Sequence, residues 1–422
     1  MTDAQYSASY VRIGAFMQGI NAVFYVPAVK KSSTGIVVLH SDSDYLSFPG
    51  GAGMASRGFL TLCANVENPS DPLEKKLFSV RLAVEEMRRQ PGIDRIVLLG
   101  HSGGATLMSL YQAVAENGAD IFRDEHRIVK LGDVPSLPAA DGIMLIDSNF
   151  GNGVMTLVSI DPAVRDEESG CSNDPAFYPF SVENGYRADG TTHYSDAFLS
   201  SYYNAQAERA ERIRQRALER LAMLEKQQGR FADDEPFLIP GGSQVAPNNR
   251  LFPQDLHLLS HTKGAYDLIH GRDGSTTHEV IRSLRMPRGA LYGTVLYGLG
   301  CWNTTVRTYL SSNCVRTLPG YRVTGTGIEG VDYDSCFCCT PGNVKHIHAP
   351  MLIMGMTGGY ECTASEVIYE NAASANKTIA FVEGGTHMLG TAHDAEQYPG
   401  QFGDAPSALF DAMAQWLTRR MK

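Results

Sequence analysis

The stretch DRIVLLGHSGGATLMSLYQAVAE, residues 94–116, decides the fold of this protein. Its first part is a short apolar run, as in a buried strand, and helical spacing of apolar residues begins near Ala105. Between the two, Gly100, Ser102 and Gly104 form the pattern G-x-S-x-G. Small residues are needed there because the backbone turns so sharply that larger side chains would collide with the strand and the helix. The stretch therefore predicts a strand–turn–helix unit that presents a serine hydroxyl.

On both sides of this unit, strand-like and helix-like segments alternate along the chain. Continuous apolar strands that alternate with helices are typical of a parallel sheet with both faces covered. The sequence therefore predicts an α/β fold, with a mostly parallel sheet and helices on both of its faces. The strand-like segments are 10–16, 22–26, 35–40, 58–65, 142–147, 351–355 and 378–382, and the helix-like ones are 73–89, 365–375 and 406–420.

The regular alternation stops from residue 151 to residue 349. One strand–helix–strand crossover needs only about 30 residues, so most of this region is an insertion. We expect a core of residues 1–150 and 350–422, with a large, mainly helical or irregular cap (residues 151–349) inserted between two late strands. The clearest element of the cap is a helix from about Ser195 to Gln228, with one apolar stripe that we expect to pack on the protein.

The first part of the insertion is rich in aromatic residues. These rings either enclose a bulky apolar or aromatic substrate, or they only pack the cap onto the core. The sequence leaves both interpretations open. The residues are Phe177, Tyr178, Phe180, Tyr186, Tyr194, Phe198, Tyr202 and Tyr203.

Composition excludes some classes of protein. The 422 residues carry 46 acidic and 36 basic side chains, a net charge of −10, whereas a nucleic-acid-binding surface is usually basic. No apolar stretch approaches the roughly eighteen residues of a membrane span, and the first residues lack the pattern of a secretory signal. We expect a cytoplasmic protein with a small-molecule substrate and no membrane or nucleic-acid partner. A homo-oligomer is possible.

One cluster of cysteines raises the question of a metal site. Cys336, Cys338 and Cys339 lie close in the sequence to His346 and His348. We expect ordinary reduced thiols in a packed loop and no metal, because eight cysteines in this length do not form a disulfide scaffold and the motif is not that of a zinc knuckle. No phosphate-binding loop or dinucleotide fingerprint is present, so no cofactor is expected.

With the G-x-S-x-G unit inside an α/β alternation, the sequence resembles the α/β-hydrolase superfamily over about residues 10–150 and 350–420. That family places its base histidine in the loop after the last strand, where this sequence has His387. The resemblance implies that Ser102 is a nucleophile and that His387 is its general base.

The third member of such a triad is less clear from the sequence. Most family members carry an aspartate after the first strand that follows the insertion, and this chain has Gly358 there. Some members keep the acid one strand earlier, where Asp147 ends a strand, although an aspartate there can also simply form a turn. We choose Asp147, with Glu361 as the next candidate. Glu366 resembles part of a helix capping box, and Glu383 is expected on a strand edge.

An oxyanion hole is also implied. The backbone N–H of Gly103 follows the nucleophile at the start of a helix, which favours an anion. The second donor is expected in the loop after the third strand, from Ser41 or Asp42, and we choose Asp42. His40 is expected to brace this loop.

These residues predict hydrolysis of a carboxylic ester or lactone through an acyl-enzyme on Ser102. The same groups also suit amides, thioesters or activated carbon–carbon bonds, and acyl transfer to an alcohol. A non-catalytic ligand-binding protein is a third interpretation, which the absence of an aspartate at Gly358 keeps open.

Overall fold

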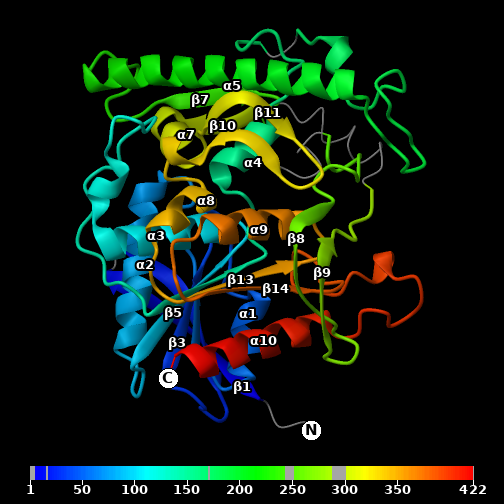
Figure 1. The fold of residues 1–422 in the computed structure, drawn as a ribbon. Helices are drawn as coiled ribbons and strands as arrows, with labels where there is room; N and C mark the ends of the chain where they lie inside the picture. The colour runs from blue at the N-terminus through cyan, green and yellow to red at the C-terminus, as the bar shows by residue number, and fades with distance from the viewer. Residues whose placement is uncertain (1–4, 16–17, 170–171, 243–250, 288–300, 422) are drawn as a thin grey trace.

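The computed structural model describes residues 5–15, 18–169, 172–242, 251–287 and 301–421, so Phe16 of the first expected strand lies outside the described residues. Ten of the described strands form one sheet (Figure 1). In sheet order they are β1 (Tyr6–Ala15), β2 (Gln18–Pro27), β4 (Thr61–Ala64), β3 (Thr34–Leu39), β5 (Arg95–His101), β6 (Gly142–Ile146), β13 (Met351–Met356), β14 (Lys377–Val382), β8 (His261–Ile269) and β9 (Thr276–Arg282).

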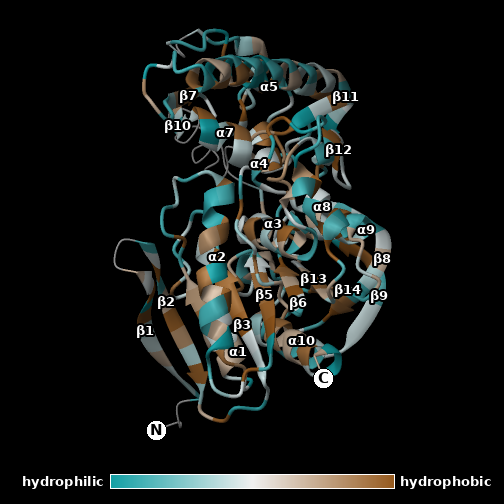
Figure 2. Cartoon of the chain, turned by 90° about the vertical axis from the view of Figure 1, so that its left-hand side faces the viewer, coloured by the Kyte–Doolittle hydropathy of each residue, from teal (hydrophilic) through white to brown (hydrophobic). Residues whose placement is uncertain are grey.

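The centre of the sheet is parallel. Strands β4, β3, β5, β6, β13, β14 and β8 pair in parallel, whereas β1, β2 and β9 are antiparallel to their neighbours. Every residue of β3, β6 and β13 is buried, which explains their continuous apolar sequences. Figure 2 shows these central strands largely in brown, the hydrophobic end of the scale. The expected α/β architecture is confirmed.

Helices cover both faces of the sheet. The apolar side chains of α2 (Leu73–Arg88), α3 (Gly104–Asn117) and α9 (Glu361–Asn371) pack in one buried cluster. Those of α1 (Pro49–Ala55) and α10 (Ala405–Arg420) pack in a second cluster on the opposite face. Because successive side chains of a strand point to opposite faces, each buried strand contributes to both clusters.

The region 151–349 contains more than helices. It holds α4 (Asn152–Ser159), α5 (Asp196–Glu225), α7 (Val306–Ser312) and α8 (Thr340–Asn343). It also holds two small antiparallel sheets, β7 (Pro236–Pro240) with β10 (Cys301–Thr305), and β11 (Arg316–Val323) with β12 (Ile328–Asp332). None of the helices in the described residues is both long and apolar enough to span a bilayer.

The long helix of this region begins where the sequence predicts. The Ser195 hydroxyl accepts a hydrogen bond from the backbone N–H of Phe198 and so caps α5. Residues of its apolar stripe, such as Ile213 and Ala217, are buried. Figure 1 shows α5 lying across the end of the molecule that is farthest from β1.

The hairpin β8–β9 departs from the expectation that residues 151–349 form only a cap. The end of β8 pairs in parallel with the end of β14, with Leu268 opposite Phe381 and Ile269 opposite Val382. The hairpin therefore extends the core sheet. Its apolar pattern is weak because most of β9 is exposed at the sheet edge, so the sequence does not reveal it. The separation of a cap from the core remains a prediction.

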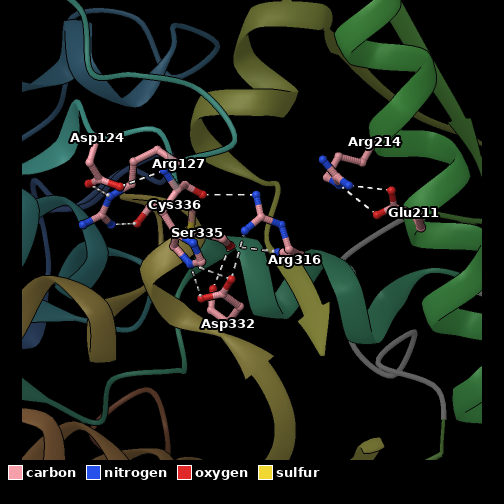
Figure 3. Close-up of polar contacts among 9 residues, drawn as sticks. Asp124, Arg127, Glu211, Arg214, Arg316, Asp332, Ser335 and Cys336 are labelled. Atoms are coloured by element: carbon pink, nitrogen blue, oxygen red, sulfur yellow. Dashed lines mark hydrogen bonds and ion pairs between the residues drawn. The ribbon is translucent and has the colours of Figure 1, made fainter. Parts of the chain in front are cut away.

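Hydrogen bonds of two arginine side chains, each also held by an ion pair, link the inserted region to the core (Figure 3). The guanidinium of Arg127, which follows α3 in the chain, pairs with Asp124 and donates to the carbonyl of Cys336 at 2.9 Å. On β11, Arg316 pairs with Asp332 of β12 at 3.1 Å. These contacts hold the cysteine-containing segment in one place against the core.

A buried arginine holds α5 to the rest of the inserted region. The side chain of Arg209 is fully buried and forms a bidentate ion pair with Glu167. It also donates to the carbonyls of Asp161, at 2.5 Å, and Pro240, at 2.7 Å. Removing this guanidinium would take away the hydrogen bonds that it donates to one carboxylate and two buried carbonyls.

We therefore expect Arg209→Met to lower the free energy of unfolding by about 3 kcal/mol, because one variant removes several buried hydrogen bonds at once. Arg212 lies on the same helix with an exposed side chain, so Arg212→Met should change stability by less than about 0.5 kcal/mol. Urea unfolding of both variants measures the difference. Equal stability of the two would show that Arg209 does not hold α5 in place.

Candidate active site

The turn between β5 and α3 places Ser102 in a left-handed backbone conformation, with φ of 54°. The chain is crowded on both sides of it. A Cβ atom on Gly100 would lie 2.6 Å from Ala105 Cα, and one on Gly104 would lie 2.6 Å from the carbonyl oxygen of Leu39. Only glycine fits these two positions, which is the physical reason for the G-x-S-x-G pattern.

The structure brings Ser102, His387 and Asp147 together in one chain of hydrogen bonds. His387 Nε2 lies 2.9 Å from Ser102 Oγ, and His387 Nδ1 lies 2.8 Å from Asp147 Oδ2. The carboxylate of Asp147 is fully buried, and its second oxygen accepts the backbone N–H of Met356 at 2.7 Å. Because Nδ1 faces a carboxylate, it carries the proton, and Nε2 is free to accept one from the serine.

Of the other carboxylates considered from the sequence, only Glu361 reaches the histidine. Glu361 Oε1 lies 3.4 Å from the same Nδ1 atom of His387. Glu366 instead accepts the backbone N–H groups of Lys263 and Gly264 on β8, and Glu383 pairs with His270.

The expected capping box that includes Glu366 is wrong, because α9 begins four residues earlier than predicted, at Glu361. Gly358 carries no side chain for a steric reason. A Cβ atom there would lie 2.5 Å from the carbonyl oxygen of Gly385. An aspartate at this position does not fit the backbone, and the carboxylate that contacts His387 comes from the position after β6 instead.

Two carboxylates therefore flank the same histidine. Burial lowers the pKa of His387, but the charge of Glu361 and the hydrogen bond to Asp147 outweigh it, and the pKa rises to about 9. Burial raises the pKa of Glu361, and the nearby His387 partly offsets this rise. Glu361 Oε2 is buried and has no hydrogen-bond partner among the described residues. His387 and Glu361 thus each shift the pKa of the other.

A second histidine, which the sequence did not single out, holds the loop of His387. His101 is fully buried, and its Nε2 lies 2.6 Å from the carbonyl oxygen of His387. A carbonyl only accepts, so this nitrogen carries the proton, and Nδ1 accepts from the Tyr45 hydroxyl at 2.6 Å. Burial lowers the pKa of His101 well below its ordinary value, which keeps the ring neutral in this role. Its place beside Ser102 in the elbow is its only signal in the sequence.

The loop after β3 lies beside Ser102, but the backbone N–H of Asp42, predicted as the second oxyanion donor, already has an acceptor. The backbone N–H groups of Asp42 and Ser43 both donate to His40 Nδ1, at 3.2 and 3.1 Å. His40 therefore braces the loop, as expected, and the N–H of Asp42 is already used. The backbone N–H groups of Ser41 and Gly103 have no acceptor among the described residues. A Cβ atom on Gly103 would lie 3.1 Å from Ser41 Oγ, so the two residues lie side by side.

A cavity of about 610 Å³ opens above these groups. Its volume lies within the range of small-molecule sites in proteins. None of the eight aromatic residues at the start of the insertion lines this cavity. Tyr194, Tyr202 and Tyr203 are buried in the apolar core cluster. Its wall includes both apolar and charged side chains: Met155, Phe252, Leu284, Tyr360, Met388, Arg285, Glu361 and Asp394.

Three features occur together in this structure: the strand order, the glycine-flanked turn after β5 and the histidine in the loop after β14. This chain has the α/β-hydrolase fold. In that fold the carboxyl ends of the parallel strands carry the site, and Ser102, Asp147 and His387 lie just beyond the ends of β5, β6 and β14.

Neither a protein-family model nor a curated protein matches the sequence. Among solved structures, the chain is similar to DcsB in complex with its substrate analogue, at 12% identity over 98% of this chain and 100% of that one, with a TM-score of 0.45. It is also similar to the α/β hydrolase GrgF from Penicillium sp. sh18, at 12% identity over 98% of this chain and 99% of that one, with a TM-score of 0.44. The similarity to Est1E from Butyrivibrio proteoclasticus is 10% identity over 98% of each chain, with a TM-score of 0.39. These overlaps are too loose to identify a function, so the function must be inferred from the site itself.

The cysteine segment lies behind this site. Cys336 Sγ and Cys339 Sγ are 3.3 Å apart, and both side chains are buried together with that of Cys338. The carbonyl of Cys338 accepts the N–H of Gly153 at the start of α4. Three thiols with these positions suit soft metals, but a structural zinc site needs a fourth ligand, and none converges on them among the described residues.

Because Glu361 and Asp147 both raise the pKa of His387, we expect activity to increase toward alkaline pH. His387 must be neutral to accept the serine proton, so kcat/KM should rise with pH through an apparent pKa near 9. Glu361→Gln removes one negative neighbour and lowers the pKa of His387, so the rise should move to lower pH. Profiles of kcat/KM against pH for the two proteins measure this shift.

Glu383→Gln is the matched control, because Glu383 pairs with His270 rather than with His387. Its profile should coincide with that of the wild type. A Glu361→Gln profile that also coincides with the wild type would show that this carboxylate does not act on the histidine.

Proposed function

We propose that this protein is a serine hydrolase that cleaves a carboxylic ester or a lactone through an acyl-enzyme on Ser102. The observation that carries the proposal is the hydrogen-bonded chain Ser102–His387–Asp147, which lies at a cavity large enough for a small molecule. Nucleophile and base within hydrogen-bond distance, with the base oriented by a buried acid, are the features that such chemistry requires.

The first half of the reaction follows from these positions. His387 Nε2 accepts the hydroxyl proton while Ser102 Oγ attacks the carbonyl carbon of the substrate. The backbone N–H groups of Gly103 and, in place of the predicted Asp42, Ser41 stabilise the oxyanion. The carbon–oxygen bond to the alcohol then breaks, and His387 returns its proton to the departing oxygen. Asp147 stabilises the transient imidazolium.

In the second half, water takes the place of the serine hydroxyl. His387 accepts a proton from the water, whose oxygen attacks the acyl carbon. The bond to Ser102 Oγ breaks, the serine recovers its proton from the histidine, and a carboxylic acid leaves. With a lactone the released alcohol and acid belong to the same molecule.

The cavity supports a substrate of moderate size. Its volume of about 610 Å³ holds more than a short acyl group, and the side chains of Met155, Phe252 and Leu284 provide apolar contact. The aromatic residues of the cap do not contribute to this wall, so they give no support to an aromatic substrate. The volume of the cavity and these three apolar side chains support a substrate that carries a bulky apolar group.

The decisive variants are Ser102→Ala and Asp147→Asn. Each should lower the hydrolysis of a p-nitrophenyl ester by at least about 1,000-fold, because the first removes the nucleophile and the second the group that orients the base. The wild type should also be labelled at Ser102 by a fluorophosphonate, and Ser102→Ala should not. An unlabelled wild type without esterase activity would overturn the proposal and favour the ligand-binding alternative.

A comparison of esters tests the size of the substrate. We expect a higher kcat/KM for a bulky apolar p-nitrophenyl ester than for the acetate, because a larger group gains contact with the apolar wall of the cavity. The ratio of the two kcat/KM values is the measurement. Equal values, or a preference for acetate, would remove the bulky group from the proposal and leave the reaction itself untouched.

A further inference from the structure

A second cluster of functional side chains lies in the inserted region, outside the wall of the active-site cavity. His193 lies just before α5, whereas Asp255 and His257 lie in the segment between β7 and β8. Although they are about sixty residues apart in the sequence, one ligand atom from each of the three side chains lies within 4.8 Å of the other two. None of the three takes part in the chemistry proposed above.

The two imidazoles face one carboxylate from two sides. His193 Nδ1 lies 3.4 Å from Asp255 Oδ2, and His257 Nδ1 lies 3.0 Å from Asp255 Oδ1. The centroids of the two rings are 4.4 Å apart. Two ligands bound about 2.1 Å from a tetrahedral zinc ion lie roughly 3.4 Å from each other. The His193–Asp255 separation equals this value, and the His257–Asp255 separation is shorter, at hydrogen-bond distance without an ion.

The carboxylate is held in position before any ion binds. Asp255 Oδ2 accepts the backbone N–H of Tyr194 at 3.0 Å, and Oδ1 accepts the backbone N–H of His257 at 3.0 Å. Such hydrogen bonds orient a ligating carboxylate. The side chain of Asp255 is buried, yet no lysine or arginine of the described residues forms an ion pair with it. A buried carboxylate normally has a cationic partner or a metal ion.

The histidines leave the cluster open to solvent. Their side chains are 66% and 72% exposed, whereas that of Asp255 is 1% exposed. A metal ion can therefore enter without unfolding the region, and a water molecule can complete its coordination. Two nitrogens and one oxygen suit zinc, whereas calcium and magnesium prefer oxygen ligands only.

We propose that His193, Asp255 and His257 form a zinc-binding site. The bound ion joins the segment before α5 to the segment that carries Asp255 and His257. The second segment also carries Phe252 and Pro253, which line the active-site cavity. Zinc would thus hold one wall of the cavity to the long helix, without contact with the reacting groups.

The test is zinc binding by chelator-treated full-length protein, measured by equilibrium dialysis with ZnCl₂. We expect His193→Gln and His257→Gln each to lose one equivalent of zinc, or to bind it at least about 10-fold more weakly than the wild type. Both side chains are exposed, so the variants should fold.

The matched control is His278→Gln. His278 is also exposed and pairs with Asp267 at 2.9 Å, but no third ligand joins that pair among the described residues. This variant should bind as much zinc as the wild type. Zinc should also raise the melting temperature of the wild type and of His278→Gln, but not that of His193→Gln or His257→Gln.

Among the described residues, two other groups of side chains can compete for zinc: the three buried cysteines, and His101 with Asp147 and His387. Cobalt distinguishes the cysteines, because only thiolate ligands give a sulfur-to-cobalt charge-transfer band, and the proposed site should show none. Equal zinc stoichiometry in the wild type and in both histidine variants would overturn the proposal. None of these readouts depends on esterase activity, so the proposal stands or falls separately from the proposed function.

Discussion

The hydrogen bond between His387 and the buried carboxylate of Asp147 joins parts of the chain that are 240 residues apart. It can form because β6, β13 and β14 run in parallel in register, so the loops after them leave the sheet at the same edge. Within this frame Asp147 adopts a left-handed conformation, with φ of 45°, and its carboxylate accepts the N–H of Met356, the last residue of β13. The parallel ladder is therefore the constraint on which the whole site depends.

The position of the acid shows how steric limits choose among equivalent solutions. The loop after β13 approaches Gly385 too closely for a side chain at Gly358, and the same loop then starts α9 at Glu361. That glutamate lies near the same Nδ1 atom of His387 that Asp147 contacts, without displacing Asp147. A histidine beside two carboxylates holds its proton more strongly than one beside a single carboxylate, so the backbone of this loop affects the pKa of His387.

The inserted region packs against the residues that line the cavity. The N–H of Gly153, at the start of α4, donates to the carbonyl of Cys338, and Asn152 beside it lines the cavity. Arg127 holds the segment around the cysteines through a hydrogen bond to the carbonyl of Cys336, and Arg316 holds it through an ion pair with Asp332 (Figure 3). Rigid support of this kind limits the movement of reacting groups, which the proposed acyl transfer would require. Phe252 and Arg285, which also belong to the inserted region, line the cavity as well.

Local sequence by itself determined the elbow of Ser102, the α/β alternation and helix α5, because each depends on neighbours along the chain: glycines in a tight turn, apolar periodicity and a serine cap. It placed His387 only through the resemblance to a family. Only the tertiary structure showed that Asp147 lies closer to His387 than Glu361 does, that the N–H of Asp42 already has an acceptor, that His101 contacts the loop of His387 and that β8–β9 joins the sheet. Those outcomes depend on which loops meet at one edge and on which N–H groups are already used, and no pattern within a single segment records either.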